Sequence, residues 1–201
     1  ALARNAKERT GQRVLRIDTH GKAMLTRLGG GRTIYSHNQL YGRWRVCARG
    51  EFPDTKRTLR LALHTTRHSA LLFSASDIEL LDADGLRRHR YLSRLGPDIL
   101  DAALDWKTLR DRSQSPEFRR RSIAALYVDQ HYLAGSGDYL RSEILFAARI
   151  HPWRRPCELP TAALSQLGRQ TLTIARRSYR TDGVTNPPKL AARLRAQAVF
   201  R

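Results

Sequence analysis

The sequence is short of the residue types that build several common kinds of protein. It has only two cysteines, Cys47 and Cys157, and they lie too far apart in the chain to form a CxxC pair. We therefore expect free thiols, and neither a disulfide framework nor a zinc site made from this chain alone. No apolar run approaches the roughly 20 residues that cross a bilayer, and the polar, basic stretch 1–16 lacks the pattern of a signal peptide. The sequence predicts a cytoplasmic protein with no membrane partner.

Acidic residues are also scarce. The 201 residues include 18 Asp and Glu against 37 Lys and Arg, which gives a formal net charge of +19. Residues 1–92 carry 18 basic and 8 acidic side chains, and residues 93–201 carry 19 and 10. A detachable basic tail would concentrate this charge at one end, so we expect both halves to face the same polyanion. Nucleic acid is the commonest such partner, and a basic surface that serves only solubility is the alternative.

The apolar pattern changes character near residue 90. Before this point, short runs alternate apolar and polar residues as half-buried strands do, most clearly over Leu59–His64. After Leu95-Gly96-Pro97-Asp98, apolar residues recur every three or four positions, as in helices. The predicted strands span 21–28, 32–37, 41–48, 59–64 and 70–74, and the predicted helices span 122–132, 138–150 and 161–180, the last capped by Thr161. We therefore expect an α+β protein in which a β-sandwich or barrel precedes a helical domain.

A glycine-containing turn, Gly135-Ser136-Gly137, separates the helices predicted over 122–132 and 138–150. The first backbone N–H groups of the second helix have no partners within the helix, and the helix dipole adds to their attraction for phosphate. Arg119–Arg121 and Arg141 are expected to surround the turn with positive charge. Many plain helical hairpins also have glycine turns, so a purely structural turn stays open as an alternative.

Five stretches, in order between about residue 11 and about residue 185, match the motifs of one known family. They are Ala125–Leu145 with its glycine turn, Tyr35–Gly42, Phe73–Glu79, Leu95–Asp98 and Thr19–Ala23. The first resembles the helix–two-turn–helix signature of the formamidopyrimidine-DNA glycosylase/endonuclease VIII family. The next two are similar to the endonuclease VIII branch, and the last two resemble the family's domain junction and its lysine turn.

The resemblance implies a domain organisation and an activity. It implies a β-sandwich over residues 1–92 that is incomplete at its N-terminal side, a helix–two-turn–helix domain over 93–190, and a tail over 191–201 that leads to an absent zinc finger. It further implies a monomeric DNA glycosylase/AP lyase of base-excision repair that removes oxidised pyrimidines from damaged double-stranded DNA. The implied chemistry is a Schiff base on an N-terminal proline, formed with an extruded nucleotide and followed by β,δ-elimination. Zinc is structural in the family and its ligands would lie outside this chain, so we expect no cofactor bound here.

The resemblance also assigns roles to single residues. Lys22 matches a lysine that is implicated as a proton donor during elimination. Gln39, Leu40 and Tyr41 match the residues that fill the gap left by the extruded nucleotide. From the alternating pattern alone, Leu40 and Tyr41 would be ordinary strand residues. Arg94 matches a DNA-contacting arginine just before the domain junction.

Departures from the family pattern qualify these assignments. Asp138 stands where the family has an asparagine that donates to a DNA phosphate, and an aspartate cannot donate, although it caps a helix equally well. The Pro-Glu start of the family is absent, so we expect that the amine of Ala1 is not the nucleophile and that the chain is inactive by itself. Glu143 matches an acidic residue of the second helix and is expected to be structural.

Two other classes of function remain open. A non-catalytic, structural nucleic-acid binder could use a helix–two-turn–helix module, as ribosomal proteins do. A metal-dependent nuclease could use Asp77, Glu79 and Asp98, although no DxD or ExK pattern accompanies these residues.

Overall fold

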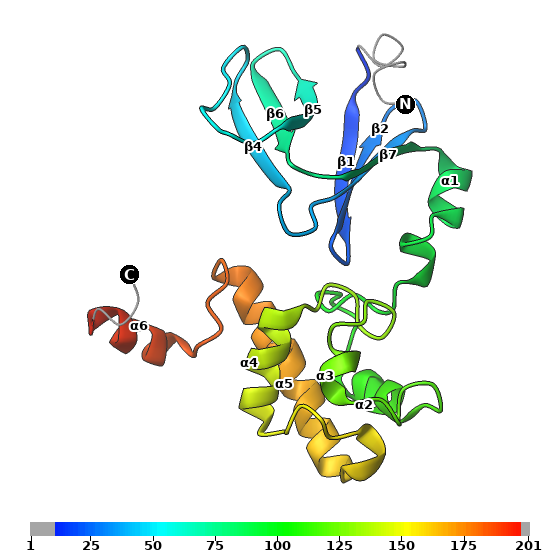
Figure 1. The fold of residues 1–201 in the computed structure, drawn as a ribbon, viewed down its shortest axis with the longest axis vertical. Coiled ribbons are helices and arrows are strands. Elements are labelled where there is room, and N and C mark those ends of the chain that lie inside the picture. The colour runs from blue at the N-terminus through cyan, green and yellow to red at the C-terminus, as the bar shows by residue number, and fades with distance from the viewer. Residues whose placement is uncertain (1–10, 198–201) are drawn as a thin grey trace. The chain divides into compact units, whose positions relative to one another are not determined.

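Two compact units make up the chain, with the division after Ser93. The computed structural model describes residues 11–197. We call the part up to Ser93 the β unit and the part from Arg94 onward the helical unit (Figure 1). The strands lie before this division, and most of the helical residues follow it. The predicted α+β class is therefore confirmed.

The β unit contains two antiparallel sheets. The first has the strand order β1-β2-β3-β7 and the second has the order β4-β6-β5. A short helix, α1 (Ala83–Arg88), follows the last strand. The strands are β1 (Val14–His20), β2 (Ala23–Leu28), β3 (Thr33–His37), β4 (Arg43–Ala48), β5 (Leu59–His64), β6 (His68–Phe73) and β7 (Asp77–Leu81).

The strands form where the alternating pattern predicts them, with two additions. The strand predicted over 59–64 has these bounds in the structure, and the other four predicted strands correspond to β2, β3, β4 and β6. The alternating pattern identified neither β1 nor β7. β1 and β7 are the edge strands of the first sheet; the apolar residues of β1 do not alternate, and β7 has only five residues, so each gives a weak or short apolar signal. Ala23, Leu25 and Tyr35 form the buried centre of the first sheet.

The helical unit packs around the longest helix, α5. Its buried residues recur at spacings of three and four, as in Leu164, Leu167, Thr171 and Ala175, so one continuous face lies in the core. Pro160, rather than the predicted Thr161, is the N-cap residue. The helices of the unit are α2 (Trp106–Gln114), α3 (Ile123–Leu126), α4 (Asp138–Ala148), α5 (Thr161–Arg180) and α6 (Pro188–Ala196), with short 3-10 turns η3 (Leu92–Arg94) at its start and η4 (Pro156–Glu158) before α5.

The helix predicted over 122–132 is wrong in length, because α3 ends at Leu126. Beyond it, the Asp129 carboxylate accepts a hydrogen bond from the backbone N–H of His131 at 2.9 Å, which favours a turn over a continued helix. The Gln130 carbonyl accepts a hydrogen bond from the N–H of Gly96 at 2.9 Å, so its partner lies outside this stretch of chain and not one helical turn further along it. Apolar spacing continues through this stretch because its side chains are still buried, as Tyr127 and Tyr132 are.

Close contact between α2 and α5 generates a prediction about Gly168. A Cβ added there would lie 2.8 Å from the backbone oxygen of Trp106, which cannot move as a side chain can. Gly168→Ala should therefore lower the free energy of unfolding by about 1–3 kcal/mol, the usual cost of overpacking, although alanine is otherwise the better helix former. Urea unfolding measures the change. Gly85→Ala in α1 is the matched helical control, because the atoms nearest to its added Cβ belong to side chains; equal stability changes in the two variants would contradict the prediction.

Candidate nucleic-acid interface

The turn between β1 and β2 and the loop between β3 and β4 lie at the same end of the first sheet (Figure 1). In the register of this sheet, Ala23 on β2 pairs with His37 on β3, and His37 pairs with Asp77 on β7. Lys22 occupies the turn just before Ala23, and residues 38–42 directly follow His37. The strand pairing therefore brings together two segments that the sequence singles out separately.

The loop between β3 and β4 is a tight turn with a fixed backbone. The N–H of Gly42 donates to the carbonyl of Asn38 at 2.7 Å, and a Cβ on Gly42 would lie 2.6 Å from that same oxygen, so the turn requires glycine. Gln39 adopts a left-handed conformation with a φ of 50°. Its side-chain oxygen accepts a hydrogen bond from the Ser76 hydroxyl at 2.8 Å. These bonds hold the turn against the residues before β7.

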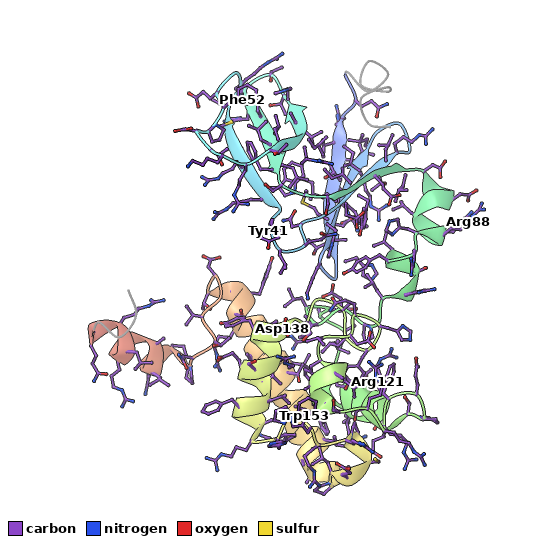
Figure 2. All side chains as sticks on the ribbon, viewed as in Figure 1. Tyr41, Phe52, Arg88, Arg121, Asp138 and Trp153 are labelled. Carbon is purple, nitrogen blue, oxygen red and sulfur yellow. The ribbon has the colours of Figure 1, made fainter. Side chains whose placement is uncertain are left out.

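Leu40 and Tyr41 are among the most exposed apolar side chains of the β unit. Their exposed fractions are 88% and 70%, and Arg57 donates to the Tyr41 carbonyl at 2.6 Å (Figure 2). They belong to the turn, because β4 begins only at Arg43, so the strand interpretation from alternation alone is wrong for both. Exposure of adjacent apolar and aromatic side chains on a fixed turn is costly for a soluble protein and suits insertion between nucleic-acid bases.

Lys22 sits on a turn that is tied to the end of the β unit. Its backbone N–H donates to the hydroxyl of Tyr91 at 3.3 Å, and its side chain is exposed. The Tyr91 ring in turn lies 5.0 Å from the imidazole of His37. An exposed ammonium in this position can grip a phosphate or deliver a proton to a bound molecule.

His37 is a potential functional residue that sequence reasoning did not single out. Its Nε2 atom is buried and has no hydrogen-bond partner within residues 11–197. Burial lowers the pKa of His37, the charge of Lys22 lowers this pKa further, and Asp77 opposes both effects. Asp77 also accepts a hydrogen bond from the buried Tyr35 hydroxyl at 3.3 Å. The motif around Tyr35–Gly42 contains His37, but only the strand register shows that it lies beside the Lys22 turn.

In the helical unit, the glycine turn before α4 is shaped by Gln130. The Gln130 side chain donates to the Ser136 carbonyl at 2.7 Å and accepts from the N–H of Gly135 at 3.0 Å. Gly135 has a φ of 88°, which side chains rarely allow. Gly137 is the N-cap of α4 and no side chain caps the helix, so the first-turn N–H groups are available to an anion. The Ser136 hydroxyl is fully buried beside them and has no partner in the described part of the chain.

Asp138 is the first residue of α4, which corrects its expected role as a cap. The N-cap position belongs to Gly137, and the Asp138 side chain is 84% exposed. Its carboxylate forms an ion pair with Arg141 at 3.0 Å, one helical turn along. The helix dipole favours a carboxylate here, but the same carboxylate would repel a phosphate bound to the first-turn N–H groups.

The segment Arg119–Arg121 was expected around the glycine turn, and this expectation is wrong for Arg119. The carbonyl of Arg119 accepts from the N–H of Cys157 at 3.0 Å, and the N–H of Ile123 donates to the carbonyl of Arg154 at 2.9 Å. These bonds place the start of the segment against residues that follow the C-terminal end of α4. The Arg119 backbone therefore lies beside the segment that follows α4, whereas the Arg121 side chain pairs with Asp129 at 2.6 Å.

Arg94 begins a segment that runs beside residues 130–134. Its side chain is exposed, and its carbonyl accepts from the His131 imidazole at 2.7 Å. Two residues later, a Cβ on Gly96 would lie 2.2 Å from the His131 carbonyl oxygen. The backbones at Gly96 and His131 are therefore too close together for any residue but glycine at position 96. Arg94 is thereby fixed near the residues that precede the glycine turn.

Glu143 on α4 accepts a hydrogen bond from the Thr185 hydroxyl at 2.7 Å. Tyr139 also donates to the Gly183 carbonyl, and Arg177 donates to the Thr185 carbonyl at 2.7 Å. Glu143 thus helps to anchor the turn after α5.

The residues considered for metal binding do not form a metal site. Cys47 and Cys157 belong to different units, and residues 11–197 contain no group of three or more His, Cys, Asp or Glu side chains able to hold a metal ion. The side chains therefore do not fit a structural zinc ion. Asp77 accepts a hydrogen bond from Tyr35, Glu79 pairs with His89 at 3.3 Å, and Asp98 accepts a hydrogen bond from the N–H of Leu100.

Ala1 lies outside the described residues. Of the helices between residues 11 and 197, none combines the length and the apolar character needed to cross a membrane.

Comparison with solved structures shows which known fold the chain has. The fold is similar to that of Lactococcus lactis formamidopyrimidine-DNA glycosylase bound non-covalently to DNA that contains an AP site, with a TM-score of 0.77, 21% identity, and coverage of 91% of this chain and 70% of that one. A complex between the L. lactis enzyme and DNA that contains an abasic site gives a TM-score of 0.78 at 20% identity, over 93% of this chain and 68% of that one. The chain therefore has the fold of formamidopyrimidine-DNA glycosylase.

Curated relatives give the family. Endonuclease 8 of Salmonella arizonae is 48% identical over 180 residues, which cover 90% of this chain and 68% of the relative. Endonuclease 8 of Pectobacterium atrosepticum is 48% identical over 179 residues, with coverage of 89% and 68%. No family model matches the sequence. The chain belongs to the formamidopyrimidine-DNA glycosylase/endonuclease VIII family.

The lowered pKa of His37 leads to a prediction about pH and stability. The unfolded chain takes up a proton on this imidazole near pH 6.5, whereas the folded chain does so only at lower pH. The contribution of neutral His37 to stability is therefore present above pH 6.5 and is lost as the pH falls through the folded-state pKa. Between about pH 7.5 and about pH 5.5, the melting temperature should fall less steeply in His37→Gln than in the parent. Differential scanning fluorimetry measures both slopes, with the exposed His20→Gln as control; identical slopes in His37→Gln and the parent would contradict the prediction.

Proposed function

We propose that this chain binds damaged double-stranded DNA, and that the protein acts in base-excision repair as a glycosylase/AP lyase on oxidised pyrimidines. The observation that carries this proposal is the fixed, exposed Gln39-Leu40-Tyr41 turn at the same sheet end as Lys22. Family membership supplies the reaction class, a Schiff base on an extruded nucleotide followed by β,δ-elimination. We call the Gln39-Leu40-Tyr41 turn the wedge. It gives a reason for damage selectivity, because a damaged nucleotide leaves its stack at lower free-energy cost than an intact one.

Within this proposal, each residue of the turn does a different task. Leu40 wedges between bases, Tyr41 stacks on one, and Gln39 offers an amide to the base that has lost its partner. The hydrogen bond from Ser76 to Gln39 holds the amide in place before DNA arrives. Lys22 binds the phosphate next to the extruded nucleotide and supplies a proton during elimination.

The helical unit is proposed to hold the DNA backbone. The uncapped N–H groups at the start of α4 bind a phosphate, and Arg94 binds another. Zinc has no part in the steps proposed for these residues, because their side chains do not fit it. We also propose that one chain binds one duplex as a monomer, and that the boundaries 1–92, 93–190 and 191–201 are its functional divisions.

A structural nucleic-acid binder remains the second candidate, because a helix–two-turn–helix module with free first-turn N–H groups contacts any phosphate backbone. The two candidates differ in their preferred ligand. A repair protein should bind a duplex with an abasic-site analogue more tightly than the same duplex intact, and more tightly than RNA. Preference for undamaged RNA would support the structural binder.

The wedge is tested by the double variant Leu40→Ala/Tyr41→Ala. Binding to the abasic-analogue duplex should weaken by about 1–3 kcal/mol, the usual contribution of base–aromatic stacking, and binding to the intact duplex should weaken less. Fluorescence anisotropy at one fixed salt concentration measures both affinities. Phe52→Ala, another exposed aromatic of the β unit, is the control. Equal losses on the two duplexes would show that the turn only supports the fold.

Asp138→Asn tests the phosphate site at α4. The substitution removes a carboxylate that repels phosphate, supplies an N–H donor, and frees Arg141 from its ion pair. Affinity for the abasic-analogue duplex should rise several-fold at low salt, with the gain shrinking as salt screens the charges. The melting temperature should change little, because exposed ion pairs stabilise proteins only weakly. An unchanged affinity at low salt would mean that no phosphate approaches this end of α4.

A further inference from the structure

A strongly basic surface lies at the C-terminal end of α4, away from the glycine turn. Residues 151–155, which follow the helix, are all exposed. Hydrogen bonds join this segment to the residues before α3: the N–H of Ala124 donates to the Pro152 carbonyl at 3.0 Å, and the N–H of Ile123 donates to the Arg154 carbonyl at 2.9 Å. Figure 2 shows Asp138 and Trp153 at opposite ends of α4, within one unit.

We call this surface the arginine–tryptophan patch. It consists of Trp153 and six exposed arginines, Arg119, Arg120, Arg121, Arg149, Arg154 and Arg155. Only two of these arginines have carboxylate partners in the described part of the chain, Arg121 with Asp129 at 2.6 Å and Arg154 with Glu158 at 3.6 Å. The other four have no carboxylate partner among the described residues and contribute to the formal net charge of +19. Such local excess repels itself and is most simply explained by an anionic partner.

Trp153 differs from the other two tryptophans. Trp106 is covered by the guanidinium of Arg169, which lies 3.9 Å from its ring centroid, and Trp44 is half-buried on β4. Trp153 is 73% exposed, and neither a ring contact nor a cation–π contact involves it among residues 11–197. The fold therefore uses two indoles and leaves the third on the surface among arginines.

The backbone at Arg149 adds a further observation. This C-cap residue has a left-handed φ of 55°, a conformation in which glycine is common and an arginine is rare. Backbone strain of this kind is found most often where a side chain has a function, so the Arg149 side chain is a candidate contact to a ligand.

We propose that the arginine–tryptophan patch is a second nucleic-acid site that binds single-stranded DNA. Phosphates would contact the unpaired arginines, and one base would stack on the Trp153 indole. A duplex keeps its base faces covered, so it could use the arginines but not the indole. An acidic peptide would need a groove for its side chains, and the pockets found in the helical unit and the β unit are lined by other residues.

The second site is separate from the proposed duplex site. α4 spans 11 residues, and a helix of this length rises about 16 Å. A duplex phosphate at Gly137 and a single strand at Trp153 can therefore be bound at once. The inference does not rest on the proposed repair activity, since its residues take no part in the duplex site.

The experiment uses the full chain saturated with unlabelled abasic-analogue duplex, to which a fluorescein-labelled oligo-dT of about 12 nucleotides is added. The oligonucleotide should still bind, with its anisotropy rising to saturation. Trp153→Ala should weaken this binding at least about fivefold, the low end of the contribution from base–aromatic stacking, and Trp153→Phe should recover most of the loss. Arg120→Ala/Arg155→Ala should reduce the slope of log affinity against log salt by about 0.7 for each lost phosphate contact.

Matched controls separate the patch from general charge and aromaticity. Arg60→Ala removes another exposed arginine without a carboxylate partner among the described residues, and Phe52→Ala removes another exposed aromatic. Neither should alter oligo-dT binding, and the patch variants should leave duplex affinity unchanged. Circular dichroism melts confirm that each variant is folded. If the chain binds no duplex, the proposed function fails but this test proceeds without the competitor and is decided by the same variants.

Two results would overturn the proposal. One is displacement of oligo-dT by the duplex, since this would mean that both ligands share a single site. The other is unchanged oligo-dT binding in Trp153→Ala together with displacement of the labelled oligo-dT by inorganic polyphosphate as effective as that by unlabelled oligo-dT. This result would show an electrostatic surface without base recognition.

Discussion

Ala23 pairs with His37, and His37 pairs with Asp77, across the neighbouring strands β2, β3 and β7 of the first sheet. A shift of this register by one residue would move every side chain of a strand to the other face and would separate the Lys22 turn from the loop at 38–42. The buried Ala23, Leu25 and Tyr35 hold the register, because they must all face the same core. The position of the candidate wedge beside Lys22 thus depends on apolar burial several residues away.

The positive charge of the chain imposes a second constraint on both units. Several of its few carboxylates are paired with arginines inside their own unit, as Asp18 is with Arg16 and Arg27. Exposed pairs of this kind contribute little stability, but they relieve local repulsion. The arginines left over are concentrated on exposed segments, where a polyanion can neutralise them. The cationic side chains lie at the surface, and the core of the helical unit contains uncharged side chains such as Tyr127 and Tyr132.

Sequence patterns predicted the elements with a long, regular spacing of apolar residues and missed strands without one. α5 has the predicted bounds because one face of it is fully buried, and β5 has them because its apolar residues alternate. β1 and β7 lack that signal, and α3 ends early because Asp129 and Gln130 use their polar groups elsewhere. The site divides in the same way. Gln39, Leu40, Tyr41 and Lys22 could be named from a family resemblance. His37 comes beside the Lys22 turn through strand pairing, and Tyr91 through a hydrogen bond from the Lys22 N–H, and no local pattern encodes either contact.

The two ends of α4 show why adjacency in sequence misplaced the arginines. Arg119–Arg121 and the glycine turn lie on either side of α3 in the sequence, yet the Arg119 backbone lies against the segment that follows α4. The two ends also differ in physics. At the N-terminal end, backbone N–H groups and the positive pole of the dipole attract an anion, and Asp138 moderates that attraction. At the C-terminal end, the negative pole favours the cationic side chain of the C-cap residue Arg149. A helix of this kind can hold anions at both ends, with its backbone at one end and with its side chains at the other.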